Sequence, residues 1–131
     1  MPRAHRIMAM LSVGNLTRSR AMYEAVLGGE KVYQFPPEGE PAFLTLRFGT
    51  TELGLGVLGD GTALHGRPLR PATGHRIELC LDVEDVDVAL GELQGLGLVV
   101  AMATVDQPWG ERAAYVEDPD GNLVMLVAPT K

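Results

Sequence analysis

Residues 107–122 read Gln107-Pro-Trp-Gly-Glu-Arg-Ala-Ala-Tyr-Val-Glu-Asp-Pro-Asp-Gly-Asn122, and an apolar run follows. This stretch predicts a strand, a tight turn and a second strand. Pro119 fixes φ for the second position of a turn, and Gly121 tolerates a positive φ. Asp118 and Asn122 can bond nearby backbone. An ordinary hairpin is the simplest interpretation, and the rest of the chain gives it a wider meaning.

The composition is that of one globular domain. The chain has 131 residues, of which 46% are hydrophobic and 21% charged, and this length suffices to bury a core. No apolar run approaches the roughly 20 residues that span a bilayer, and the first residues do not form a secretion signal. One cysteine, Cys80, excludes an internal disulfide and fits a reducing compartment. The sequence therefore predicts a cytoplasmic protein without a membrane partner.

The charge argues against nucleic acid as a partner. The formal net charge is −6, and the arginines are too scattered to form the basic stripe that phosphate binding needs. An acidic surface favours cationic ligands through long-range attraction, although it also serves solubility.

The first half of the chain predicts a strand, a helix and three further strands. Asn15 or Thr17 can cap the helix, and Gly28 with Gly29 ends it. A stretch rich in Gly and Pro then predicts a linker. The expected strands are 7–13, 31–35, 42–48 and 52–58, the helix 15–27 and the linker 59–74.

After the linker the same pattern returns. Placing Val13 on Val83 also places Asn15 on Asp85, with one residue of slip before the glycines that end the two helices. We therefore predict an α+β fold in which two tandem βαβββ modules, about 5–58 and 75–128, form a cleft between curved mixed sheets within a single domain, 1–131. The second module is expected to contain strands 77–83, 98–104, 111–117 and 122–128 and a helix over 85–96.

Alternation along the strands predicts which side chains share a face. One face of each sheet should lie under its helix, and the free faces, turned toward each other, would build a concave ligand site. The expected helix-side residues are Ile7, Ala9, Leu11, Ile77, Leu79, Leu81, Val124 and Leu126. The expected cleft-side residues are Met8, Met10, Glu52, Gly54, Gly56, Glu78, Cys80, Ala113, Tyr115, Met125 and Val127.

These features together resemble the vicinal oxygen chelate superfamily, which includes glyoxalase I, extradiol dioxygenases and the fosfomycin- and bleomycin-resistance proteins. The resemblance covers nearly the whole chain. It implies a homodimer, with the cleft built within one chain or by modules exchanged between two. It rests on residues 13–28, Val83-Glu-Asp-Val-Asp87 and its helix, Pro108-Trp-Gly110 and Asp118-Pro-Asp-Gly-Asn122.

The resemblance also implies where a divalent ion would be bound. Metal-using members hold it with His and Glu on the first strand and on a late strand of each module. Only one of the corresponding residues can bind a hard cation, because a thioether or a bare backbone is a poor ligand for such ions. We therefore expect no metal, no cofactor and no catalytic residue. The corresponding positions are Met8, about Gly54, Glu78 and Met125.

Four other side chains bear on this expectation. Glu52 lies two residues from Gly54 on the same face, so a weak metal held by Glu52 and Glu78 stays open. His5 would need a shift of register to reach the site. His65 and His75 lie in or beside the linker, where a surface role is expected.

Methionine at former ligand positions predicts a soft apolar pocket. Met8, Met10 and Met125 can adapt to irregular shapes and contact aromatic rings, although each could also be plain core. Gly54 and Gly56 leave bare backbone on the cleft side of their strand, which makes room for a bulky flat ligand.

Three aromatic residues could supply stacking surface. They are Trp109 and Tyr115 at the mouth of the second module and Phe43 on the first. Trp109 could instead simply pin the Pro-Trp-Gly loop.

Glu78 is the notable polar group expected in this pocket. A carboxylate in an apolar cleft needs a cation or hydrogen-bond donors, or it becomes protonated. A basic ligand would meet that need, and so would an ion pair with Arg47, Arg76 or Arg112. Both explanations stay open.

The leading hypothesis is a metal-independent protein that sequesters an aromatic or cationic antibiotic-like compound, as resemblance to bleomycin-type resistance proteins implies. The alternative is a glyoxalase- or dioxygenase-like enzyme with Glu78 as base or metal ligand. A small regulatory or assembly partner is a third possibility, because an open sheet edge also recruits protein.

Overall fold

The computed structural model describes residues 2–57, 66–71 and 74–130, which form two four-stranded sheets. No helix in these ranges is long and apolar enough to cross a bilayer. The first module contains β1 (Ala9–Ser12), α1 (Leu16–Arg20), η1 (Ala21–Val26), β2 (Glu30–Phe35), β3 (Phe43–Phe48) and β4 (Thr51–Gly56). The second contains β5 (Leu79–Asp82), α2 (Val86–Gly95), β6 (Val100–Asp106), β7 (Glu111–Glu117) and β8 (Leu123–Pro129). The α+β fold of two tandem βαβββ modules is confirmed.

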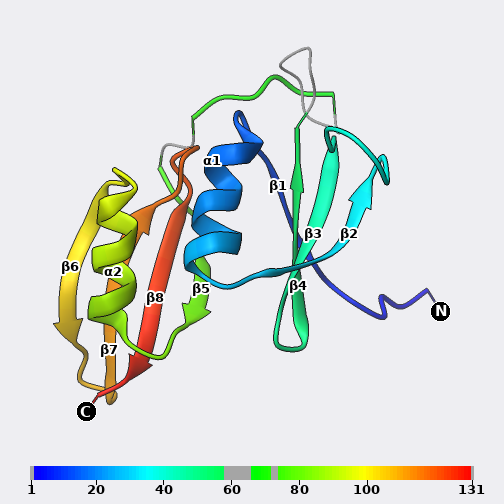
Figure 1. Cartoon of the computed structure of the whole chain (residues 1–131). Helices are drawn as coiled ribbons and strands as arrows, with labels where there is room; N and C mark the ends of the chain where they lie inside the picture. The colour runs from blue at the N-terminus through cyan, green and yellow to red at the C-terminus, as the bar shows by residue number, and fades with distance from the viewer. Residues whose placement is uncertain (1, 58–65, 72–73, 131) are drawn as a thin grey trace.

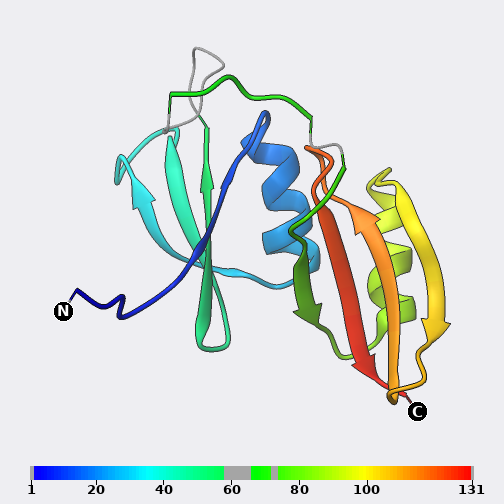
Figure 2. The ribbon, with the colours of Figure 1, turned by 180° about the vertical axis from the view of Figure 1, so that it is seen from behind.

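Both sheets have the same topology. Their strand orders are β1-β4-β3-β2 and β5-β8-β7-β6, and each module's first strand pairs in parallel with its last. The modules lie side by side, with β1 and β5 as neighbouring inner edges (Figure 1). Figure 2, the view from behind, shows the faces of the two sheets opposite to the helices, which we call the open faces. Both open faces look out on this side of the molecule.

The two modules begin in the same way. Asn15 caps α1 by accepting a hydrogen bond of 3.0 Å from the Arg18 amide, and Asp85 caps α2 by accepting one of 3.0 Å from the Val88 amide. Caps of this kind satisfy amides that have no partner within the helix. Asn15, and not Thr17, is therefore the cap.

The slip of one residue between the modules has a structural cause. The helix expected over residues 15–27 is α-helical only at its start and continues as the wider π-helix η1, in which the Leu27 amide reaches the Met22 carbonyl. A π turn accommodates one extra residue. Both helices then end at a glycine with positive φ, Gly28 at +80° and Gly97 at +82°.

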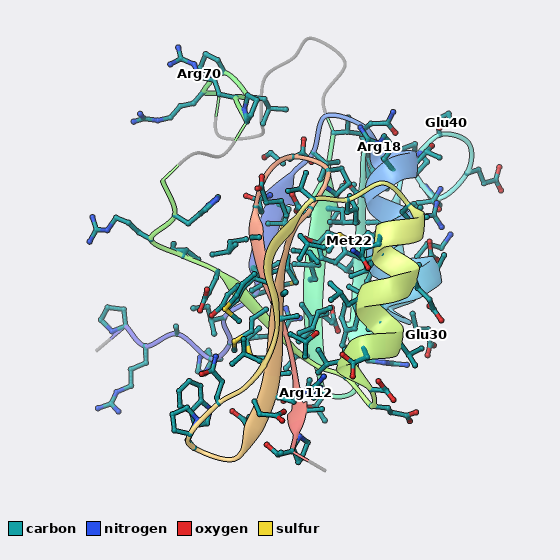
Figure 3. All side chains as sticks on the ribbon, turned by 90° about the vertical axis from the view of Figure 1, so that its left-hand side faces the viewer. Arg18, Met22, Glu30, Glu40, Arg70 and Arg112 are labelled. Carbon is teal, nitrogen blue, oxygen red and sulfur yellow. The ribbon has the colours of Figure 1, made fainter. Side chains whose placement is uncertain are left out.

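One hydrophobic core runs under the helices of both modules. Tyr23, Leu55, Leu93 and Leu126 have no exposed surface, and they belong to a single cluster. Figure 3 shows Met22, also fully buried, between the helices and the strands. Neither module completes this core alone.

Three residues expected on the helix side are exposed instead, Ala9 among them. Ile7 is 96% and Ile77 84% exposed, because β1 and β5 begin two residues further along the chain. Alternation predicts which face a residue belongs to, but it does not show where the strand begins. Strand β6 likewise starts at Val100 and not at 98. His65 lies outside the described residues.

Candidate functional site

The open face of the first sheet carries an apolar cluster over bare backbone. Met10 pairs with Gly54 across β1 and β4, and its sulfur lies over Gly54 in the space that a side chain would fill. The Phe43 ring lies 3.2 Å from the Cβ position of Gly54 and 3.8 Å from that of Gly56. Tyr33 extends the cluster, with its ring centroid 6.0 Å from that of Phe43. Glycine here leaves space that the neighbouring Met10 and Phe43 side chains share.

The open face of the second sheet carries a mixed cluster. Cys80, Met125 and Tyr115 are paired across β5, β8 and β7, so they share this face. The Tyr115 hydroxyl donates a hydrogen bond of 3.1 Å to Glu78 Oε1. Burial raises the pKa of Tyr115, and the bond to Glu78 raises it further, so the hydroxyl keeps its proton and remains a donor.

Glu78 is therefore held by a tyrosine and not by an arginine. Arg47 pairs with Glu30. Arg112, labelled in Figure 3, pairs with Asp106 and with Asp87 in the first turn of α2. Within the described ranges no arginine forms an ion pair with Glu78. Its carboxylate is exposed just before β5, and its second oxygen is available to a ligand.

The two remaining expected site residues lie off the strands. Met8 is half-buried just before β1, where its sulfur lies 3.5 Å from Arg6 Nη2. Trp109 is 66% exposed in the turn between β6 and β7, and its Nε1 donates a hydrogen bond of 2.8 Å to Glu111 Oε1. That bond is compatible with both the stacking and the loop-pinning interpretation of Trp109.

A cleft of about 540 Å³ separates the two modules. None of the sequence-derived site residues lines it, although Glu52 and Cys80, both expected on the open faces, do. Glu52 forms an ion pair of 3.0 Å with Arg6 at this cleft. Its lining comes from β1, β5, the end of η1 and the hairpin between β3 and β4, namely Ala9, Leu27, Gly28, Phe48, Gly49, Thr51, Glu52, Leu53, Leu79, Cys80, Leu81 and Asp82.

The family model described as "Glyoxalase/Bleomycin resistance protein/Dioxygenase superfamily" matches residues 4–126. The chain belongs to this superfamily. No curated protein is similar enough to the chain to count as a match.

Solved structures of the glyoxalase superfamily share the fold over nearly the whole chain. A member from Sphaerobacter thermophilus is 27% identical, with 96% of this chain and 98% of that one covered and a TM-score of 0.67. TioX from Micromonospora sp. ML1 is 19% identical, with coverage of 96% and 97% and a TM-score of 0.69. Lactoylglutathione lyase from Agrobacterium tumefaciens is 22% identical, with coverage of 98% and 96% and a TM-score of 0.62.

The residues expected at the metal-ligand positions of the superfamily do not suit a metal ion. Met8, Gly54 and Met125 offer thioethers or bare backbone, and Glu78 alone offers a hard oxygen ligand. Within the part of the chain that the structure describes, no three His, Cys, Asp or Glu side chains converge to hold a metal ion. The donor set does not fit the metal chemistry of the superfamily.

Sequence reasoning missed what the Asp-Pro-Asp-Gly-Asn turn does. Asp118 is only 4% exposed and accepts a 2.7 Å hydrogen bond from the hydroxyl of Tyr23, a residue of the other module. It also accepts bonds from the backbone amides of Asp120 and Asn122. Asp120 in turn accepts a 2.9 Å bond from the Gly14 amide. The turn joins the modules, and a sequence shows no partner so distant along the chain.

A second feature that sequence reasoning missed concerns the exposed isoleucines. Ile7 closes the tripeptide His5-Arg6-Ile7, and Ile77 closes the identical tripeptide His75-Arg76-Ile77 at the matching place before the second module. All six residues are exposed. The identity of the tripeptides, at the offset that relates the modules, was the available signal.

Proposed function

We propose that this glyoxalase-superfamily member binds an aromatic or cationic antibiotic-like compound without using a metal, and so protects the cell by sequestration. One observation carries the proposal. Soft apolar side chains and glycines stand where a metal site would need ligands, and one carboxylate, Glu78, faces outward beside them. Affinity would come from buried apolar area, stacking and one charge pair.

Each cluster would contribute a different part of the binding energy. Met10 and Phe43 beside Gly54 form an apolar platform for a flat ring, with sulfur–aromatic contacts of about 0.3–1.5 kcal/mol each. On the second module, Glu78 would attract a cationic group, and the face of the Tyr115 ring would add a cation–π contact of about 0.5–1 kcal/mol at an exposed position.

We propose further that the protein works in the cytoplasm as a homodimer. The open faces leave large apolar side chains in water, among them Met10 at 47%, Tyr33 at 52% and Phe35 at 57% exposure. Ile7 and Ile77, just before β1 and β5, are exposed as well. Contiguous exposed apolar side chains commonly mark an interface. A second copy laid on these faces would place one copy's first module opposite the other's second module and enclose the ligand between them.

Equilibrium dialysis against a panel of aromatic antibiotics, with and without a cationic group, tests the binding function. We expect saturable binding of planar or cationic members, and weaker binding of the cationic members by Glu78→Gln. The control Glu92→Gln removes an exposed carboxylate on α2 and should bind as the wild type does. Absence of saturable binding by every planar and every cationic member would contradict the proposal.

An enzyme is the second candidate, and the Tyr115–Glu78 hydrogen bond favours it. A carboxylate beside a tyrosine hydroxyl can act as a general base if its pKa and reach suit the substrate. Metal analysis of protein purified without chelator, together with turnover assays on glyoxalase and dioxygenase substrates, separates the two functions. Stoichiometric Fe, Mn, Zn or Ni would favour the enzyme.

A further inference from the structure

The cleft between the modules has the dimensions of a ligand site. Its volume of about 540 Å³ falls within the roughly 300–1,000 Å³ typical of small-molecule pockets. The residues that line it differ from those on which the proposed function rests, so a ligand here would occupy a separate place.

The interior of the cleft is apolar. Leu53, Leu79 and Leu81 line it from the strands, and Leu27 and Phe48 line it from the end of η1 and from β3. Leu53 is 7% exposed and the others are half-buried at the margin of the core. These side chains would gain about 25 cal/mol for each Å² that an apolar ligand removes from water.

The rim of the cleft is acidic. Glu52 has a side chain that is 31% exposed, and its partner Arg6 approaches with a side chain that is 56% exposed. Asp82 is exposed at the end of β5, and no cation among the described residues forms an ion pair with it. The Cys80 thiol adds no negative charge, because burial and the neighbouring Asp82 raise its pKa. The C-terminal end of η1, beside Leu27 and Gly28, adds the negative end of a helix dipole.

We propose that this cleft binds a small apolar amine, with its ammonium group between Glu52 and Asp82 and its hydrocarbon part against the leucines. An anion would be repelled by Asp82, whose charge is not offset as that of Glu52 is by Arg6. A neutral apolar molecule would cover Asp82 without giving it a partner, at a cost in solvation. The amine alone satisfies the acidic rim and the apolar interior together, and it requires none of the residues on which the proposed function rests.

Fluorescence titration with three dansyl probes tests this site. Dansylcadaverine carries a primary ammonium, dansylamide carries no charged chain and dansylglycine carries a carboxylate. We expect saturable 1:1 binding of dansylcadaverine in the cleft, with dansylamide weaker by about tenfold and dansylglycine weaker still. Equal affinity for the three probes, or no saturable binding of dansylcadaverine, would overturn the proposal.

Substitutions in the cleft lining test whether dansylcadaverine binds there. Asp82→Asn and Glu52→Gln should each lower the affinity for dansylcadaverine by about fivefold, which is the contribution of one partly exposed ion pair. Ala9→Trp should abolish binding, because the exposed Ala9 lines the cleft and a large ring there would fill it. Glu92→Gln, outside the cleft, should bind as the wild type does. Unchanged affinity in Asp82→Asn and Glu52→Gln would refute the site even if Ala9→Trp fails to fold.

The same titration separates this site from the proposed function. If Glu78→Gln abolishes dansylcadaverine binding while Asp82→Asn does not, the amine binds on the open face. That result would overturn the cleft proposal and support the proposed function. Binding of dansylcadaverine in the cleft without binding of any aromatic antibiotic would support the cleft proposal and contradict the proposed function.

Discussion

Tyr23 forms a hydrogen bond between the two modules through its hydroxyl. This hydroxyl donates a hydrogen bond of 2.7 Å to the buried Asp118. Burial raises the pKa of Tyr23, and the nearby Asp118 charge raises it further, so the hydroxyl keeps its proton. Tyr23→Phe should therefore lower the free energy of unfolding by about 1.5–3 kcal/mol, the range for a hydrogen bond to a charged group. Urea denaturation measures it. Tyr33→Phe alters a tyrosine that is 52% exposed and should change stability by less than about 0.5 kcal/mol; equal stabilities of the two variants would refute this role.

Asp120 should make stability depend on pH. Burial raises its pKa, the Asp118 charge acts in the same direction, and the Gly14 amide and Arg18 oppose both. A folded-state pKa above the unfolded one favours the protonated native state. Its stabilising contribution is complete below the ordinary Asp pKa near 3.9 and is lost as pH rises through the raised value.

Asp120→Asn removes this titration and keeps an oxygen for the Gly14 amide. Urea denaturation between acidic and neutral pH should show the variant gaining stability relative to wild type as pH rises through that window. A difference that stays constant with pH would show that Asp120 is not shifted in the folded protein.

At this scale the sequence predicts residue types better than residue partners. The resemblance to the superfamily predicts Met8, about Gly54, Glu78 and Met125 at the metal-ligand positions, and this remains a prediction. The partners of Asp118 and Glu78 could not be predicted, because Tyr23 and Tyr115 lie far away along the chain and only packing brings them close. The exposure of Ile7 and Ile77 likewise depends on where the strands begin.

The glycines differ in how much space an added Cβ would find. A Cβ on the buried Gly29, between η1 and β2, would lie 2.7 Å from the Phe48 ring, 2.9 Å from the Tyr23 carbonyl oxygen and 3.0 Å from Leu46 Cβ. Gly29→Ala should lower the free energy of unfolding by about 1–3 kcal/mol, because the backbone cannot yield.

Gly54→Ala, within β4, is the contrasting variant. The added Cβ meets first the flexible end of Met10, which is 47% exposed and can move, and then the Phe43 ring at 3.2 Å. We expect a stability change below about 1 kcal/mol, together with weaker binding of planar ligands because the platform is rearranged. Gly56→Ala, whose Cβ would have ordinary contacts at 3.8–3.9 Å, is the control. Thermal or urea unfolding of the three variants ranks their losses of stability. A loss of stability in Gly54→Ala as large as that in Gly29→Ala would contradict the prediction.

Element type and order could be predicted because period, caps and glycines are local signals. The strands of both modules and the two caps follow from them. The π turn in η1 was visible only as the slip of one residue between the helices, since its wider hydrogen bond, from Leu27 to Met22, has no sequence signature of its own. The start of β6 was placed two residues early, at 98 and not at Val100, because alternation does not show where a strand begins.

The whole molecule is where sequence reasoning reached its limit. The internal repeat predicts two modules whose free faces turn toward each other, whereas the open faces lie side by side, away from the helices (Figure 2). With that arrangement the sequence-derived site residues fall into a cluster on each sheet and leave the cleft between the modules to other residues. A complete site then calls for a second copy.

That expectation gives a prediction about assembly. A stable interface buries about 800 Å² on each partner, which requires the apolar side chains of the open faces to be covered. Phe35→Lys places a charge on the open face of the first sheet and should shift the protein from dimer to monomer, because burying an unpaired ammonium is costly. Val88→Lys is the matched control, since Val88 on α2 is 57% exposed, as Phe35 is, but lies on the helix side. Light scattering during size-exclusion chromatography measures the mass of each variant. A monomeric wild type, or equal dissociation of both variants, would refute the dimer through the open faces. Retention of aromatic ligands by such a monomer would show that one copy suffices for binding.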